Sequence, residues 1–368
     1  MDRGCVRILH TESSCGWGGQ ELRILEESRG MAGRGHAVTI AANAESRIFR
    51  EARDRGLNAV ELPIARKNPG GIASLYRWLR SNPVDVINTH SSTDSWLAAL
   101  ACAMLRGAPP IVRTRHISAS VPDNRATRWL YVSATRHVVT TGESLRRQLI
   151  ETNGFPTDHI TSVPTGIDTR RFAPGEQSDA RRSLGLPPNA ILIGIVATLR
   201  SWKGHRFLLD AFGGLNRQDC ILVVVGDGPQ RAHLESQIAR LGIAGRVRMA
   251  ENQPDVLPWL RALDIFALPS YANEGVPQAL VQAMLCALPC VTTDVGSIGE
   301  AAVHEQTALL VAPQDADALR QALLRLVEAP WLRRSLGAAA RLHCESRFGF
   351  AQMLDRMEVI FRNAITAN

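Results

Sequence analysis

The sequence predicts an α/β fold with two doubly wound domains, each a parallel sheet covered by helices, that face each other across a cleft. A chain of 368 residues is longer than one ordinary core needs and matches the usual size of two domains. Short runs rich in β-branched residues alternate with helical patterns along most of the chain, which is typical of βαβ units. The alternation pauses once, between Val163 and Gln177, and this pause indicates the domain boundary.

Strands of the first half are expected wherever a short apolar run ends in turn residues. These runs are Val6–Thr11, Ala37–Ala42, Ala59–Leu62, Val84–Thr89, Ile111–Thr114 and His137–Thr140. The helical periodicity between them predicts helices over Gln20–Ala32, Gly71–Arg80 and Asp94–Leu105.

The second half repeats this pattern and closes in a run of helices. Its expected strands are Ile191–Ala197, Cys220–Val225, Arg246–Met249, Ile265–Leu268, Cys290–Thr292 and Ala308–Val311. We therefore predict an N-terminal domain over residues 1–168, a C-terminal domain over 169–345, and a last helix over 346–368 that packs back towards the N-terminal domain. Ligands of such sheets bind beyond the carboxyl ends of the strands, so the cleft is the expected site.

Composition limits the classes of function. Residues 1–170 hold 22 Lys and Arg against 16 Asp and Glu, whereas residues 171–368 hold 20 against 19. The basic first half would attract phosphates of a lipid or a nucleic acid. The alternative is that a charge excess of this size merely keeps the domain soluble. Seven cysteines without a Cys-x-x-Cys pair indicate reduced, buried thiols. No leader peptide or membrane-spanning run is recognisable, so we expect a cytoplasmic protein, at most peripheral on the inner face of the cell membrane.

Glycine-rich loops follow two of the expected strands. In the first, Gly18 and Gly19 would let the backbone approach an anion at a helix start, and a plain strand–helix turn explains the loop equally well. In the second, Gly226 and Gly228 follow a strand in the same order, and taken alone they favour a structural turn. Neither loop matches the Gly-x-Gly-x-x-Gly fingerprint or a P-loop.

Charged side chains follow two other strands. Arg200 and Lys203 lie directly after Ile191–Ala197, where two cations would stabilise the charge that a departing diphosphate gains; two solvated surface cations are the alternative. Glu274 lies on a Gly-Pro loop before a helix, so a carboxylate stands beside backbone donors, a pairing that suits sugar hydroxyls. Alternatively, Glu274 only offsets the helix dipole.

In combination these pieces resemble family 4 of the retaining glycosyltransferases, which have the GT-B fold of two Rossmann-like domains. The matching segments cover most of the chain, and their joint order and spacing are specific although each is short. In order they are Gly18-Gly19-x-Glu21, Val163-Pro164-x-Gly166-x-Asp168, Arg200-x-x-Lys203-Gly204, Val225-Gly226-x-Gly228-Pro229, the Glu274 loop and Val295-Gly296-Ser297-Ile298-Gly299-Glu300.

The resemblance implies a role for each matching residue. Arg200 and Lys203 would bind the donor's diphosphate, and Glu274 would hold the donor sugar. His116 matches a family histidine near that sugar, and Gly166 with Asp168 would mark the interdomain hinge. The donor-binding set implied is completed by Gly18, Gly19, Gly226, Gly228, Gly275, Val276 and Gln282.

Gln282 departs from the family pattern. The family has a second Glu at this position, eight residues after the first, which usually grips the nucleotide ribose. The amide oxygen of Gln282 can still accept a hydrogen bond from a ribose hydroxyl, but without charge assistance the bond is weaker by roughly 1 kcal/mol.

Three further features carry weaker expectations. His90 ends the strand Val84–Thr89, where a second polar contact with the ligand and a buried core or capping role are equally consistent. Asp315 and Asp317 open the last helical run, which favours a helix cap over a metal-binding pair. No His, Asp or Glu cluster has metal-ligand spacing, and no Gly-x-Ser-x-Gly elbow is present.

The predicted function is transfer of a hexose from a UDP- or GDP-sugar to a saccharide or lipid-linked saccharide, as in lipopolysaccharide biosynthesis. The resemblance implies that the anomeric configuration is retained. We expect no metal and no cofactor, and no nucleic-acid partner. An anionic membrane surface is an expected partner of the basic residues Arg47, Arg50, Arg53, Arg55, Arg66 and Lys67. A nucleotide-sugar epimerase of the same architecture and a non-catalytic nucleotide-sugar binding protein remain alternatives.

Overall fold

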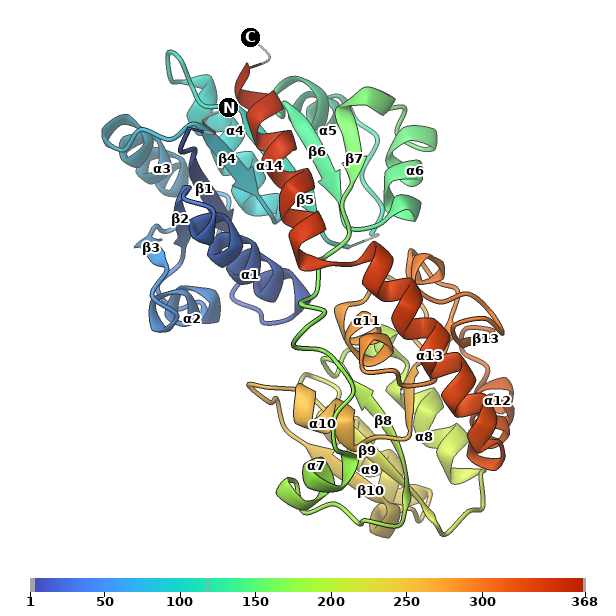
Figure 1. The fold of residues 1–368 in the computed structure, drawn as a ribbon. Coiled ribbons are helices and arrows are strands. Elements are labelled where there is room, and N and C mark those ends of the chain that lie inside the picture. The colour runs from blue at the N-terminus through green and yellow to red at the C-terminus, as the bar shows by residue number, and fades with distance from the viewer. Residues whose placement is uncertain (1–3, 118, 367–368) are drawn as a thin grey trace. The chain divides into compact units, whose positions relative to one another are not determined.

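A computed structural model of the protein describes residues 4–117 and 119–366. The chain divides into two compact units, one formed by the chain up to Thr165 together with the segment from Ala351, the other running from Gly166 to Phe350. Each unit holds one parallel sheet with helices on both faces, so the expected fold class of two doubly wound domains is confirmed (Figure 1).

The first unit is built on a seven-stranded sheet of order β3-β2-β1-β4-β5-β6-β7, in which all paired strands are parallel. The strands are β1 (Arg7–Glu12), β2 (Ala37–Ala42), β3 (Asn58–Glu61), β4 (Val86–Thr89), β5 (Ile111–Arg115), β6 (His137–Thr140) and β7 (Ile160–Ser162). The sequence did not predict β7, because three residues at a sheet edge leave little periodicity to detect. The strand order changes direction between β1 and β4, so the ends of these two strands frame the expected ligand position.

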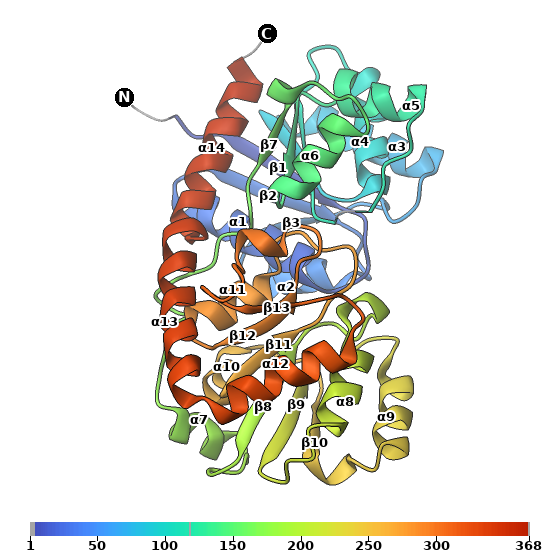
Figure 2. The ribbon, with the colours of Figure 1, turned by 90° about the vertical axis from the view of Figure 1, so that its right-hand side faces the viewer.

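Helices cover both faces of this sheet, with α1 and α14 on one side and α3, α4, α5 and α6 on the other (Figure 2). The helices and short turns of this unit are α1 (Gly19–Gly33), α2 (Arg47–Asp54), α3 (Pro69–Ser81), α4 (Ser92–Ala103), α5 (Arg125–Arg128), a π-helical turn (Trp129–Ser133), α6 (Glu143–Glu151), a 3-10 turn (Thr157–His159) and α14 (Phe350–Thr366). The main core packs Leu9, Ile87 and Ile111 of the strands against Leu97 of α4 and Leu145 of α6. Their burial supplies most of the unit's stability.

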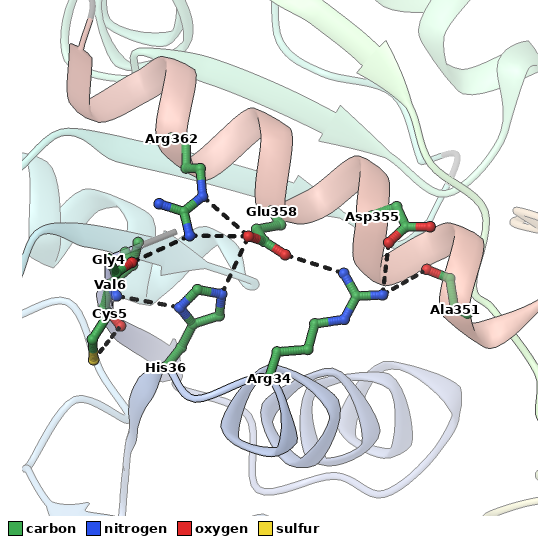
Figure 3. Close-up of polar contacts among 9 residues, drawn as sticks. All are labelled: Gly4, Cys5, Val6, Arg34, His36, Ala351, Asp355, Glu358 and Arg362. Atoms are coloured by element: carbon green, nitrogen blue, oxygen red, sulfur yellow. Dashed lines mark hydrogen bonds and ion pairs between the residues drawn. The ribbon is translucent and has the colours of Figure 1, made fainter. Parts of the chain in front are cut away.

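The C-terminal helix α14 is tied to the first unit by an ionic cluster (Figure 3). Glu358 accepts hydrogen bonds from Arg34, after α1, and from Arg362 on its own helix. The Nε2 atom of His36 lies 3.6 Å from the same carboxylate, while its Nδ1 accepts from the backbone N–H of Val6. A further anchor is Arg23 of α1, fully buried, whose guanidinium donates to the sulfur of Met357 on α14 at 3.7 Å and to the carbonyl of Val163.

The second unit contains a six-stranded parallel sheet of order β10-β9-β8-β11-β12-β13. The strands are β8 (Ile191–Val196), β9 (Cys220–Val225), β10 (Val247–Ala250), β11 (Ile265–Leu268), β12 (Cys290–Thr293) and β13 (Leu309–Val311). The order reverses between β8 and β11. Because ligands of doubly wound sheets bind at such a reversal, the loops after β8 and β11 are the expected binding loops.

The helices and short turns of this unit are α7 (Gln177–Ser183), a 3-10 turn (Ser201–Lys203), α8 (His205–Gly213), α9 (Arg231–Arg240), a 3-10 turn (Ala244–Arg246), α10 (Leu257–Ala262), α11 (Gln278–Leu285), a 3-10 turn (Ile298–Glu300), α12 (Ala316–Glu328) and α13 (Pro330–Arg347). Asp315 caps α12 by accepting from the Ala318 N–H, which confirms the cap predicted for this residue. Ile167 pairs with Gly349, so the two segments that leave this unit run side by side. In the described part of the chain, no helix is long and apolar enough to cross a membrane.

The cysteines are free thiols, and the expectation that all are buried is wrong in part. Cys220, Cys286, Cys290 and Cys344 are buried, but Cys5 and Cys15 are exposed. Burial raises the pKa of the Cys344 thiol to about 12, so this group stays protonated and unreactive at neutral pH.

Candidate functional site

Glu274 lies in the loop that joins β11 to α11 and is 5% exposed. Its Oε1 atom accepts two hydrogen bonds of 2.6 Å, one from Lys203 Nζ and one from the Ser270 hydroxyl. Within the described residues, no group donates to its other oxygen, Oε2. The carboxylate is therefore held through one oxygen and can accept hydrogen bonds from a ligand through the other.

Ser270 is a functional candidate that sequence reasoning missed. It is fully buried, and its own carbonyl accepts a 2.5 Å hydrogen bond from the Thr293 hydroxyl at the end of β12. This chain of contacts orients Ser270 toward Glu274. The detectable signal was its spacing of four residues before Glu274 at the end of a buried strand.

Two glycines permit the close approach of the loops around Glu274. A Cβ atom at Gly204, where φ is +77°, would lie 1.9 Å from the carbonyl oxygen of Pro269. A Cβ at Gly296, where φ is +63°, would lie 2.0 Å from the carbonyl oxygen of Glu274 itself. Only glycine fits at either position, because an added Cβ meets rigid backbone and the positive φ disfavours other residues.

Gly226 and Gly228 have a comparable function at the end of β9. Their φ values are +143° and +155°, and added Cβ atoms would lie 2.0 Å from the Ala197 carbonyl oxygen and 2.8 Å from that of Leu199. The two glycines thus bring this loop against the loop after β8, which carries Arg200 and Lys203. Their contact with a nucleotide stays a prediction.

Arg200 and Lys203 lie on the same loop but have different surroundings. Lys203 is half-buried and forms the ion pair with Glu274, whereas Arg200 is exposed and its guanidinium carbon lies 5.7 Å from the centre of the Trp202 ring. In the described part of the chain, no acid pairs with Arg200. The structure therefore pairs Lys203 with Glu274 and leaves Arg200 on the exposed surface of this loop.

Backbone donors stand beside the Glu274 carboxylate. Gly275 and Val276 are buried between Glu274 and the start of α11, and their N–H groups donate to no described residue. Gln282 lies in the second turn of α11 and is half-buried, with no side-chain hydrogen bond to the described residues. Free backbone donors at a helix start favour oxygen-rich or anionic ligands.

In the first unit, Gly18 caps α1 in an extended conformation, with Gly19 as the first helical residue. The loop before them is held by Glu12, a fully buried residue that the sequence reasoning missed. Its carboxylate accepts from the Ser14 N–H at 2.6 Å, from the Ser91 hydroxyl at 2.5 Å, and from the Gln20 amide. Burial, with the nearby charge of Asp94, raises the pKa of Glu12 to about 8.

His116 follows β5 and is one end of a row of three imidazoles. Its Nε2 atom lies 3.0 Å from Nδ1 of His90, and Nε2 of His90 lies 2.9 Å from Nδ1 of His10. His10 and His90 are buried, so His90 has the buried position that was one of its two expected roles. Burial lowers the pKa of all three imidazoles, that of His10 to about 3.

The predicted membrane-binding cluster is partly neutralised within the first unit. Arg47 pairs with Glu51 and stacks on Trp17, its guanidinium carbon 4.3 Å from the ring centre. Arg55 pairs with both Glu51 and Glu26. The attraction of this surface for anions is therefore weaker than the arginine count suggests.

A cavity of about 610 Å³ lies in the first unit between α14 and the end strands β6 and β7. Its walls include Arg136, His137, Asp355 and Arg356, and none of the predicted site residues. The loops at the sheet reversals carry the predicted chemistry, so we assign no donor-site role to this cavity. Among the described residues, no three His, Cys, Asp or Glu side chains are grouped so as to hold a metal ion.

Two family models match the chain in tandem. The model described as Glycosyltransferase Family 4 matches residues 17–171, and the one described as Glycosyl transferases group 1 matches residues 176–343. Together they leave only residues 172–175 unmatched between the two segments. The chain belongs to glycosyltransferase family 4. It is a transferase of sugars, as its relatives also indicate.

Among those relatives is a D-inositol 3-phosphate glycosyltransferase of Catenulispora acidiphila, 27% identical over 93% of this chain and 89% of the relative. Another is the UDP-Gal:alpha-D-GlcNAc-diphosphoundecaprenol alpha-1,3-galactosyltransferase of Escherichia coli, 27% identical over 71% of each chain. A solved structure with the same fold is HepE of Anabaena in complex with UDP-glucose, with a TM-score of 0.87 at 20% identity, covering 97% of this chain and 100% of that one. The family 4 glycosyltransferase thus has the GT-B fold along nearly its whole length.

Proposed function

We propose that this glycosyltransferase transfers a hexose from a UDP- or GDP-sugar to a saccharide or lipid-linked saccharide, with retained anomeric configuration. The observation that carries the proposal is the geometry at Glu274. A carboxylate held by Lys203 and Ser270 lies beside two backbone donors at the reversal of the second sheet. Such a mixture of fixed donors and acceptors matches a sugar attached to a diphosphate.

In the proposed donor complex, Glu274 accepts hydrogen bonds from sugar hydroxyls through Oε2, and the Gly275 and Val276 amides donate to sugar oxygens. Lys203 shares its charge between Glu274 and the diphosphate, and Arg200 turns from the exposed surface of its loop toward the phosphates. Gly226 and Gly228 approach the nucleotide, and the Gln282 amide oxygen accepts from a ribose hydroxyl. The complexes of HepE with UDP and UDP-glucose support a uridine nucleotide as the first donor to test.

The proposed reaction breaks the bond between the anomeric carbon and the diphosphate oxygen and forms a bond from the same carbon to an acceptor oxygen. The bonding electrons leave with the diphosphate, and its oxygen takes the proton of the acceptor hydroxyl. Lys203 and Arg200 stabilise the charge that develops on the diphosphate, which fixed cations do without a metal ion. Gly18, Gly19 and His116 stay predicted donor contacts from the first unit.

For the acceptor we propose a lipid-linked saccharide of cell-surface glycan synthesis, as in the lipopolysaccharide pathway. The Escherichia coli relative supports this, because its name gives a sugar on diphosphoundecaprenol as acceptor. Docking on an anionic cytoplasmic leaflet through the first unit is part of the proposal. Sedimentation with phosphatidylglycerol vesicles at low salt tests it, and the same binding to neutral vesicles would contradict the electrostatic basis.

Thermal unfolding with UDP, GDP, ADP and their sugars tests the donor. A ligand at a hundred times its dissociation constant stabilises the folded state by about 2.7 kcal/mol, a readily measured shift. The Lys203→Ala variant should lose the shift. Arg182 is an exposed cation on α7, so the control variant Arg182→Ala should keep it.

Product analysis then decides the class of enzyme: nucleotide release that depends on an acceptor supports the transferase, whereas an epimerised or unchanged donor would contradict it. Unchanged turnover in EDTA is expected.

A further inference from the structure

The row formed by His10, His90 and His116 crosses three neighbouring strands of the first sheet. His10 lies near the end of β1, His90 follows β4 and His116 follows β5, and these strands are adjacent in the order β1-β4-β5. The contacts run from His116 Nε2 to His90 Nδ1 at 3.0 Å and from His90 Nε2 to His10 Nδ1 at 2.9 Å. The rings also stack, with centroids 5.2 Å apart in both pairs.

All three rings are uncharged at neutral pH. Burial lowers each pKa, and the buried cation of Arg23 on α1 opposes protonation further. Acids near the row are engaged elsewhere: Glu27 contacts Arg23, and Asp94 accepts from the Thr11 hydroxyl and the His90 backbone N–H. Each neutral imidazole therefore carries one N–H and offers one acceptor nitrogen.

Because His90 uses both of its nitrogens, the hydrogen bonds must run in one direction along the row. In one direction, His10 carries its proton on the outer nitrogen Nε2, and the row ends with an acceptor nitrogen on His116. In the other direction, all three rings carry the proton on Nδ1, and the row ends with an N–H on His116. The tautomer of one end thus determines the tautomer of the other.

The His10 end of the row favours the second direction, in which every ring carries its proton on Nδ1. His10 is fully buried, and its Nε2 atom meets no hydrogen-bond partner among the described residues. The apolar ring of Phe361 packs against it with centroids 6.4 Å apart. A buried N–H without an acceptor is rarer in proteins than a buried lone pair without a donor.

We propose that His10 donates to His90 and His90 donates to His116, so that His116 presents an Nδ1–H donor to the donor substrate. His10 and His90 are then positioning residues, and the oxygen that His116 contacts is an acceptor, such as a sugar hydroxyl or a phosphate oxygen. In this state Nδ1 of His116 takes up no proton, so the ring binds and orients rather than acting as a base. The last step rests on the proposed function; the direction of the row does not.

Nitrogen-15 NMR of the full chain with labelled histidines, without donor, tests the direction. The His116 signals, assigned by their loss in His116→Asn, should show a protonated Nδ1 and an unprotonated Nε2. In His10→Asn, whose amide can donate at the Nδ1 position, this pattern should persist. In His10→Leu, which removes the donor, His116 should shift toward the other tautomer. A wild-type His116 protonated on Nε2 would overturn the proposal by itself.

Donor binding gives the second readout. We expect His10→Leu to weaken donor affinity roughly threefold to tenfold, the effect of one misdirected hydrogen bond, with His10→Asn close to the parent. His137→Asn is the matched control, because His137 lies in the same sheet and bonds only Thr161 among described side chains. If His10→Leu had the same His116 tautomer and the same donor affinity as the parent, the proposal would also be overturned. Failure of every variant, including the parent, to bind any donor would contradict the proposed function and leave the NMR result valid.

Discussion

Lys203 Nζ lies 2.6 Å from Glu274 Oε1, so the residue predicted to bind phosphate and the residue predicted to bind sugar form an ion pair with each other. Each partner lies on a loop at the reversal of the second sheet. The attraction between the two groups offsets part of the cost of burying their charges and holds both in place, while Oε2 of Glu274 stays available.

Replacing the cations tests their function directly. Lys203→Ala and Arg200→Ala should each lower kcat by roughly a hundredfold or more, because each removes a charge that stabilises the departing diphosphate. Steady-state kinetics measure the loss, with Arg182→Ala as the control. Normal turnover in Arg200→Ala alone would show that this exposed residue stays at the surface and that Lys203 suffices.

Ser270→Ala should raise KM for the donor by about tenfold, because Glu274 loses a buried hydrogen bond and its free oxygen is less well oriented. The hydroxyl of Ser183 on α7 donates only to a helix carbonyl, so Ser183→Ala is the matched control. Equal KM values in the two variants would remove Ser270 from the site.

Gln282→Glu should keep or raise the affinity for the donor, since a carboxylate accepts more strongly than an amide from a ribose hydroxyl. Calorimetric titration with the best nucleotide of the thermal panel measures this. If the variant bound at least tenfold more weakly, the assignment of Gln282 to the ribose would be wrong.

Gly204→Ala should destabilise the second unit by more than about 2 kcal/mol, because its Cβ would overlap a backbone carbonyl and its φ is positive. Denaturant unfolding gives the comparison with Gly245→Ala, where an added Cβ meets nothing within 4 Å. Similar losses in both variants would show that the close approach to Pro269 is unimportant.

The cluster at α14 predicts acid sensitivity. Partial burial acts to raise the pKa of Glu358, but hydrogen bonds from Arg362 and Arg34 outweigh it and lower the pKa below 4.5. Its stabilisation is therefore complete above about pH 4.5 and is lost as the pH falls through the lower folded-state pKa. Glu358→Gln should lower the free energy of unfolding by about 1–2 kcal/mol at neutral pH. The difference in unfolding free energy between this variant and the parent should shrink below pH 4.5. Asp355→Asn is the control: because Asp355 is exposed, this variant should change the free energy of unfolding little at any pH.

Much of the fold was predictable, because the alternation of apolar strands with helices is a local pattern repeated many times. Of the strands in the described residues, twelve lie where that pattern placed them, and the exception, β7, is a three-residue edge strand. The glycines at 18, 19, 226 and 228 and the residues Lys203 and Glu274 were visible because special backbone and charged groups stand out at strand ends. Ser270, Glu12 and His10 were missed. The spacing of Ser270 from Glu274 was its one signal, and a lone polar residue within a strand, such as Glu12 or His10, has no local signature.

The sequence by itself determined two doubly wound domains and the loops that carry the candidate chemistry, since residue periodicity and glycine placement act over a few neighbouring positions. Only the tertiary structure decided which groups meet. It joined Lys203 to Glu274, which are 71 positions apart in the chain, and aligned His10, His90 and His116 from the ends of three strands. Such contacts depend on strand order and on burial from water, and neither can be read from a single stretch of chain.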